Sequence, residues 1–213
     1  MSLLSRSLLA LTLLNPIAFE ARAWGEEPPA VQLVDVITTA TLPVSRDFHA
    51  VSIGGFGSLH IVQGPETKLT VRTDVGYLSR VKAKVDDGFL RLGNKYAEDG
   101  LYPELHFELT VPTLDRISVG GGGRISVGAL VAEDLTINAS GGARVDCFAL
   151  GAVHAVLKVS GGARLEFSKL AVDDLEVFGN GGGFVLVTDG YWNREEHVTL
   201  NGGAAFRTGE DHH

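Results

Sequence analysis

Apolar and polar residues alternate in short runs over most of this chain, and glycine separates one run from the next. From Asp47 onward, no apolar period of 3.6 residues continues for the ten or more residues that a helix needs. Alternation with a period of two is typical of strands that turn one face toward a core. The pattern therefore predicts an all-β protein.

The C-terminal half of the chain repeats one pattern at a spacing of about 20 residues. The stretch "SGGARVDC" at 140–147 returns as "SGGARLEF" at 160–167. A fixed period of this length predicts a solenoid in which each unit stacks only on its neighbours. Five units share the register, with glycine pairs at 121–122, 141–142, 161–162, 181–182 and 202–203.

Each unit is too short to hold a crossover helix, so we expect it to form one coil of a parallel β-helix. Stacked coils bring equivalent residues into ladders about 4.8 Å apart. Alternation predicts that Val145 and Cys147 point into the core, while Arg144 and Asp146 point outward. The glycine pairs are expected at corners, where positive φ is needed. The alternative is a β-sandwich, which spaces strands evenly but does not require residue identities to repeat.

An earlier copy of the pattern, VSIGGFGSLHI, stands at 51–61. Gly55 precedes Gly121 by 66 residues, which equals three units of 22. The chain between them is strand-like but lacks the glycine pair. This spacing predicts three further coils in series and about seven or eight coils in all.

Residues 1–23 differ from the rest of the chain. They contain Arg6, an apolar run and an Ala-Arg-Ala site that ends at Ala23, which together predict a secretory signal peptide over 1–23. A membrane anchor would need about 20 continuous apolar residues, and Asn15-Pro16 interrupts the run. We therefore expect an exported protein, in the periplasm, at the cell surface or secreted, with no transmembrane span after cleavage.

The next segment, 24–46, contains three prolines and is expected to be a linker or a capping segment, with one strand at 31–37. The β-helix is then expected over 47–208. The net charge of −8 argues against a nucleic-acid partner, which needs a clustered basic surface. The single cysteine, Cys147, has no internal disulfide partner and is expected to be an inert core residue.

The order of these motifs resembles a known family. The series VSIGGFGSLHIVQG, VDDGFLRL, TVPTLDRISVGGGGRI and the SGGAR repeats is similar to the putative auto-transporter adhesin head GIN domain, over roughly 47–208. The resemblance implies a single-stranded right-handed β-helix in an envelope or secreted protein, with an adhesin-like role. It supplies no catalytic residues.

The most distinctive chemical feature is a column formed by Arg124, Arg144 and Arg164, which Phe184 continues in the next unit. One interpretation is a self-neutralised surface ladder, because Asp146 and Glu166 follow two residues later. The other is a docking strip, in which arginine forks bind anionic groups of a glycan or envelope polymer and Phe184 offers a stacking surface. These four residues are the candidate ligand contacts.

Other patterns that carry chemistry favour structural interpretations. The acidic pairs 86–87 and 173–174 lie beside turns, and polysaccharide-cleaving β-helix enzymes that use such carboxylates build clefts from longer loops than the interruption at 93–103. The calcium-repeat match at 141–148 has Arg144 in a position that requires glycine. We expect no metal, no cofactor and no catalytic residue. A ladder just before the corners is expected to satisfy turn backbone groups: Gly120, Ser140, Ser160, Asn180 and Asn201.

The sequence therefore favours a non-enzymatic, exported binding module whose partner is a glycan or envelope polymer, or a protein. Strand edges at the end coils also allow a homo-oligomer. Two alternatives remain open. One is a β-helix enzyme acting on an envelope polysaccharide, and the other is a purely structural or sensing protein of the envelope.

Overall fold

The computed structural model describes residues 37–94, 104–194 and 197–209, which belong to one compact unit. The signal peptide expected at 1–23, the strand expected at 31–37 apart from Ile37, and most of the interruption at 93–103 lie outside these residues. The described part is almost entirely strand. Its elements, in chain order, are β1 (Ile37–Leu42), β2 (Ala50–Ile53), β3 (Ser58–Gln63), β4 (Lys68–Asp74), the 3-10 helix η1 (Val75–Arg80), β5 (Val81–Asp86), β6 (Phe89–Asn94), β7 (His106–Val111), β8 (Arg116–Val119), β9 (Arg124–Ala139), β10 (Arg144–Gly161), β11 (Arg164–Gly181), β12 (Phe184–Trp192), β13 (His197–Leu200) and β14 (Ala205–Thr208).

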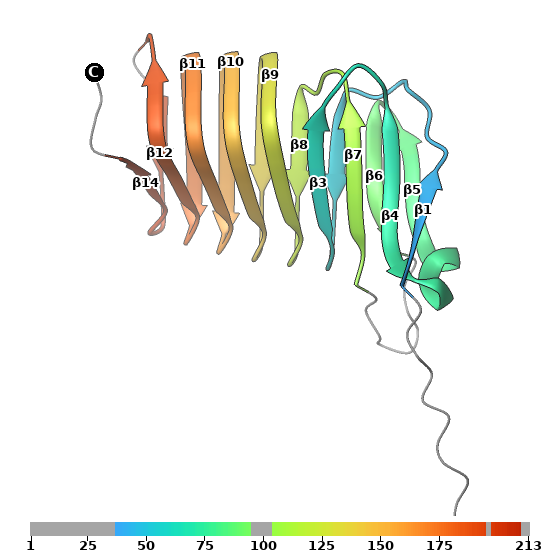
Figure 1. Ribbon diagram of the computed structural model, residues 1–213. Helices are drawn as coiled ribbons and strands as arrows, with labels where there is room; N and C mark the ends of the chain where they lie inside the picture. Colours follow the sequence, from blue (N-terminus) through green and yellow to red (C-terminus); the bar gives the residue numbers. More distant parts are fainter. Residues whose placement is uncertain (1–36, 95–103, 195–196, 210–213) are drawn as a thin grey trace, which may run out of the picture. The chain divides into compact units, whose positions relative to one another are not determined.

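The strands β9, β10 and β11 lie side by side, parallel and in register (Figure 1). Arg144 pairs with Arg124 on one side and with Arg164 on the other, which confirms the register read from the repeat. Each long strand contributes to two faces of the coil. The first part of β9 pairs with β3, whereas its last part pairs with β8. The fold is therefore the predicted β-helix.

One continuous hydrophobic core fills the space between these faces. Inward positions of equivalent coils stack on each other, and Val145 and Leu165 are fully buried. Cys147 lies in the same core, and its burial raises the pKa of the thiol to about 12. Almost no thiolate forms at neutral pH, so Cys147 packs as an inert core residue.

The glycine corners stack backbone on backbone. The N–H group of Gly142 donates to the carbonyl oxygen of Gly121 at 2.8 Å, and Gly162 donates to Gly141 at the same distance. Gly141 has a φ of 72°, and a Cβ built on it would lie 3.0 Å from the oxygen of Gly121. The corner needs glycine at this position for both conformation and space.

The position of the coil formed by β2 and β3 differs from the expectation. Gly55 lies directly beside Gly121, because the N–H group of Gly122 donates to the oxygen of Gly55 at 3.0 Å. In Figure 1, β3 lies between β9 and β7. Sixty-six residues therefore separate corners that are one coil apart, and three coils in series between them was a wrong prediction.

The intervening chain instead packs on the far side of this coil. β6 and β7 form the neighbouring strands of β2 and β3, and the short connection 112–115 then passes this coil to reach β8. Beyond them, pairing becomes antiparallel between β4 and β7, β5 and β6, and β1 and β4. The solenoid has about five turns, not seven or eight.

β1 lies within the segment 24–46 and covers the outer edge of β4. The hairpin from β5 to β6 turns at Asp87 and Gly88, which have φ values of 51° and 73°. Positive φ at both turn residues matches the twist of a tight hairpin. Within the described residues, no helix is long and apolar enough to cross a membrane.

The two glycines of one corner provide a matched test of this stacking. Gly141→Ala forces a non-glycine residue into positive φ against the backbone of Gly121 in the preceding coil. We expect it to lower the free energy of unfolding by about 1–3 kcal/mol. Gly142→Ala places its Cβ 3.6 Å from the Gly121 oxygen, an ordinary contact, without a positive φ. Urea unfolding of the two variants would measure the difference. Equal stability of both variants would contradict the stacked-corner account.

Candidate functional site

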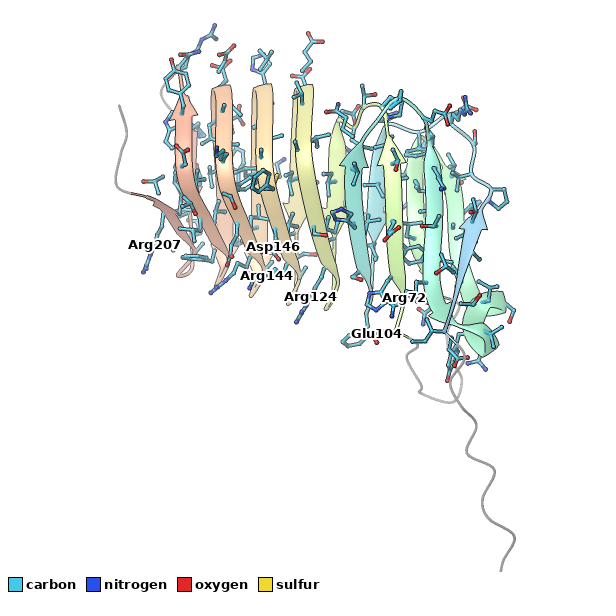
Figure 2. The ribbon with its side chains drawn as sticks, in the orientation of Figure 1. Arg72, Glu104, Arg124, Arg144, Asp146 and Arg207 are labelled. Atoms are coloured by element: carbon cyan, nitrogen blue, oxygen red, sulfur yellow. The ribbon has the colours of Figure 1, made fainter. Side chains whose placement is uncertain are left out.

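The predicted arginine column forms one outward-facing row across the sheet. Register pairs place Arg124, Arg144, Arg164 and Phe184 on neighbouring strands. Arg124 and Arg144 are visible on successive strands in Figure 2. The row also continues onto β3, β7 and β4, which the sequence repeat did not predict to lie beside β9. Its full order is Thr39, Arg72, His106, Ser58, Arg124, Arg144, Arg164, Phe184 and Ala205.

Arg144 is neutralised by two carboxylates. Its Nε donates to Asp146 Oδ1 at 2.9 Å, and its Nη2 donates to Glu166 Oε2 at 2.8 Å. The hydrogen bond to Asp146 and the negative charge there raise the pKa of Arg144. Arg164 donates through Nη1 to the other oxygen of Glu166 at 3.2 Å. These four residues form the self-neutralised ladder that was one of the two interpretations.

Phe184 contacts guanidinium groups on both sides. The Cζ atom of Arg164 lies 4.8 Å from the centroid of its ring, and that of Arg207 lies 5.7 Å away. Both distances suit cation–π attraction. The ring is therefore engaged by cations of the protein itself, which limits its use as a stacking surface for a ligand.

Arg124 differs from the other two arginines. Among the described residues it has no ion pair, whereas Arg144 and Arg164 both pair with Glu166. The cause is its neighbour two positions later, because Ser126 stands where the next coils have acidic residues. The Ser126 hydroxyl is itself bonded to His60 Nδ1 at 2.8 Å. Arg124 therefore presents an exposed and uncompensated guanidinium.

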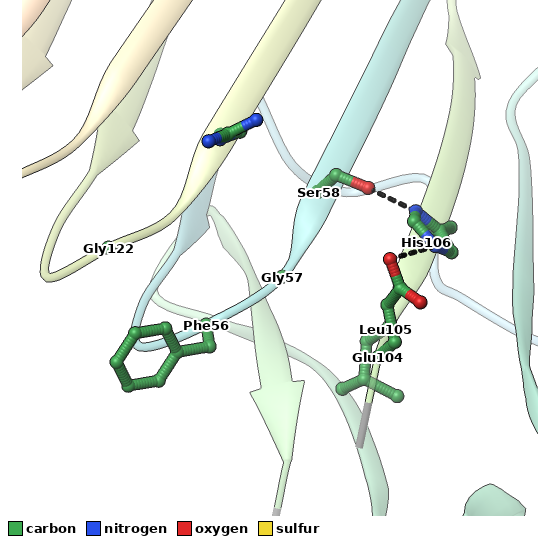
Figure 3. Close-up of a pocket in the computed structure, with 8 residues that line it drawn as sticks. Phe56, Gly57, Ser58, Glu104, Leu105, His106 and Gly122 are labelled. Carbon is green, nitrogen blue, oxygen red and sulfur yellow. Dashed lines mark hydrogen bonds and ion pairs between the residues drawn. The ribbon is translucent and has the colours of Figure 1, made fainter. Parts of the chain in front are cut away.

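A pocket of about 450 Å³ opens beside Arg124. It forms where β3 lies between β7 and β9, so residues far apart in the chain meet there. Phe56 and Gly57 precede β3, Glu104 and Leu105 precede β7, and Gly122 belongs to the neighbouring corner (Figure 3).

Three polar side chains in this pocket contact one another in series, through a hydrogen bond and an ion-pair contact. Ser58 Oγ lies 2.6 Å from His106 Nδ1, and His106 Nε2 lies 3.1 Å from Glu104 Oε1. Figure 3 shows both contacts as dashed lines. A serine, an imidazole and a carboxylate in this order are the components of a nucleophilic triad, so this group requires a test of its geometry.

The surroundings of Ser58 do not support acyl transfer. An oxyanion needs free donors directed at it, but the neighbouring backbone N–H groups are already used. Ser58 donates to Leu105, Arg124 to Gly57, and Gly122 to Gly55, at 2.8, 2.9 and 3.0 Å. The Glu104 side chain is 85% exposed and cannot hold the imidazole as a buried carboxylate does. The group is better described as a polar pocket wall.

A family model described as "Putative auto-transporter adhesin, head GIN domain" matches residues 47–209. The chain belongs to this family. Among curated proteins, none matches the chain.

Solved structures share the head GIN domain fold at low identity. A putative adhesin from Parabacteroides merdae has a TM-score of 0.62 at 13% identity, covering 81% of this chain and 95% of its own. A putative adhesin from Bacteroides fragilis has a TM-score of 0.54 at 16% identity, covering 81% of this chain and 97% of its own. At these identities the likeness shows the fold alone.

The acidic pairs of this head GIN domain serve structural contacts. Asp86 is exposed and bonded to Lys84 at 3.1 Å, which lowers the pKa of Asp86. Asp174 pairs with His154 at 2.8 Å and with Arg194 at 3.2 Å. In the parts of the chain that the structure describes, no cluster of histidine, cysteine and acidic side chains is suited to hold a metal ion.

The Ser/Asn ladder of the head GIN domain lies along a shallow groove of about 350 Å³ on the other face. Asn180 Oδ1 accepts a hydrogen bond from the N–H of Gly181 at 2.8 Å, which is the turn-stabilising role expected from the sequence. Phe178 lies in the same groove, with Lys158 Nζ 5.5 Å from its ring centroid.

The charge ladder can be tested with a double-mutant cycle. Arg144→Ala, Glu166→Ala and the double variant should show a coupling energy of roughly 0.2–1 kcal/mol, because the pair is partly exposed. The coupling should fall at high salt. Urea unfolding of each variant measures it.

The matched control is the cycle between Arg124 and Glu166, which stand two coils apart and form no ion pair. Its coupling energy should be near zero. A coupling energy as large as that of Arg144 with Glu166 would show that the charged side chains of the row interact over long range and not only through local ion pairs.

Proposed function

We propose that this head GIN domain is an exported, non-enzymatic binding module with an adhesin-like role, which presents its outward row to a glycan or another envelope polymer. The family description and the names of the similar solved structures support an adhesin-like role. The signal-peptide pattern at 1–23 supports export.

The observation that carries this proposal is the outward row itself. Parallel strands in register hold its side chains at a regular spacing on a rigid sheet. The paired arginines and carboxylates offer hydrogen-bond donors and acceptors in alternation, which suits the hydroxyl groups of a polymeric sugar. Many weak contacts along one polymer add up through multivalency.

The non-enzymatic part of the proposal has separate support. The acidic pair at 173–174 already serves contacts inside the protein, and the serine at the pocket has no oxyanion donors among its described neighbours. A polysaccharide-cleaving site needs two carboxylates held at a set separation across the substrate. Asp173 and Asp174 are instead engaged by Asn193, His154 and Arg194.

A binding panel tests the proposal. The exported chain, which mass spectrometry should show to begin at Trp24, is applied to envelope polysaccharides, peptidoglycan and a glycan array. Changing Arg124, Arg144 and Arg164 together to Ser should weaken binding by about tenfold or more, because several charged contacts are lost.

A matched control removes the same charge from the other face by changing Arg91, Arg116 and Lys158 to Ser. This variant should bind like the parent chain. Equal losses in both variants would assign the effect to net charge and contradict the row. No binding to any polymer would favour the structural or sensing role, and release of reducing sugar would favour an enzyme.

A further inference from the structure

The uncompensated charge of Arg124 lies next to the pocket between β3, β7 and β9, and this juxtaposition identifies a ligand class. A guanidinium presents a planar fork that binds carboxylates with two parallel hydrogen bonds. Arg144 and Arg164 already donate hydrogen bonds to carboxylates of the protein. Arg124 has the same position in its coil but lacks such a partner, so a carboxylate from a ligand can take that place.

The pocket has the size and wall for a sugar ring beside that fork. Its volume of about 450 Å³ lies within the range of small-molecule sites. Phe56 is 59% exposed, and its Cε1 atom lies 3.0 Å from the position of a Cβ built on Gly122. The ring thus lies against a corner glycine, where a larger residue would displace it. An exposed aromatic face packs against the apolar C–H face of a sugar.

Ser58, His106 and Glu104 supply adaptable contacts. When His106 is neutral with its proton on Nε2, the nitrogen beside Glu104, Nδ1 accepts the Ser58 hydroxyl proton, and the Ser58 oxygen is left to accept from a sugar hydroxyl. When His106 is protonated, Nδ1 donates to the Ser58 oxygen, and the hydroxyl proton can reach a carboxylate. In either state Ser58 makes one hydrogen bond with the ligand, as an acceptor when His106 is neutral and as a donor when His106 is protonated.

Glu104 also narrows the ligand class. Its carboxylate lines the same pocket and is mostly exposed. A ligand group with two negative charges, such as a phosphate ester, meets more repulsion from Glu104 than a singly charged carboxylate does. The same carboxylate can accept hydrogen bonds from sugar hydroxyls.

We propose that this pocket binds a hexuronate unit of an acidic polysaccharide. Arg124 holds the carboxylate, Phe56 packs under the sugar ring, and Ser58 and Glu104 bond its hydroxyl groups. The assignment rests on the proposed binding function and names the ligand class for one site on the row.

Titration calorimetry with trigalacturonate tests the assignment on the exported chain. Arg124→Gln should weaken binding by about tenfold or more, because the charged fork is lost. Arg124→Lys keeps the charge without the fork and should give an intermediate loss. Arg116→Gln, an exposed arginine on the other face, is the matched control, and its affinity should stay within about twofold of the parent. Thermal unfolding of each variant checks that the fold is kept.

Two further probes define the chemistry. A neutral trisaccharide built from galactose should bind more weakly than trigalacturonate, and so should glucose 6-phosphate. Equal weakening by Arg124→Gln and Arg116→Gln, or no binding of trigalacturonate to the parent, would overturn the assignment. If the parent still binds other polymers in the panel, the proposed function stands without it. Hydrolysis of p-nitrophenyl acetate that Ser58→Ala abolishes would instead assign Ser58 as a nucleophile.

Discussion

At the corners that contain Gly121, Gly141, Gly161 and Gly181, these glycines lie so close to the backbone of the preceding coil that a Cβ there would be only 3.0–3.3 Å from it. The N–H group of one corner donates to the oxygen of the corner before it, at 2.8 Å for both Gly142 and Gly162. This contact fixes the spacing and the register of the coils, and the register decides which side chains become neighbours. Glycine at 121, 141, 161 and 181 is therefore the constraint on which both the core ladders and the outward row depend.

Within that register, two arginines of the outward row are neutralised by carboxylates on the same or the adjacent coil. Arg144 and Arg164 share Glu166, and Arg144 also holds Asp146, so the middle of the row carries no free cation. At Arg124 the row loses this neutralisation, because Ser126 stands at the position of Asp146 and Glu166. The same strand lies beside the coil of β2 and β3, which brings Phe56 and Ser58 to it. The unpaired guanidinium of Arg124 and the pocket therefore lie together because the neighbouring coil, β2 and β3, comes from a distant part of the chain.

The sequence was sufficient to predict what depends on the local repeat. Alternation placed Val145 and Cys147 in the core, and the period of 20 residues placed Arg124, Arg144 and Arg164 in one row. It did not predict the pocket, because Ser58 and His106 meet through pairing between strands 48 residues apart. The glycine pair at 54–55 was recognised, but spacing alone indicated three coils where the chain makes a detour of 66 residues. Nothing local in the sequence marks such an insertion.

The most direct test of the account is a ¹H–¹⁵N spectrum of residues 24–213, the chain that the signal-peptide prediction leaves, titrated with galacturonate. The central claim is that one coil of the row carries a pocket for a single uronate unit, beside the unpaired guanidinium of Arg124. It predicts that amide shifts change at 56–58, 104–106 and 122–124, while those of Arg144 and Arg164 stay in place. Shifts that spread evenly along the row, or that gather in the groove around Phe178, would contradict it.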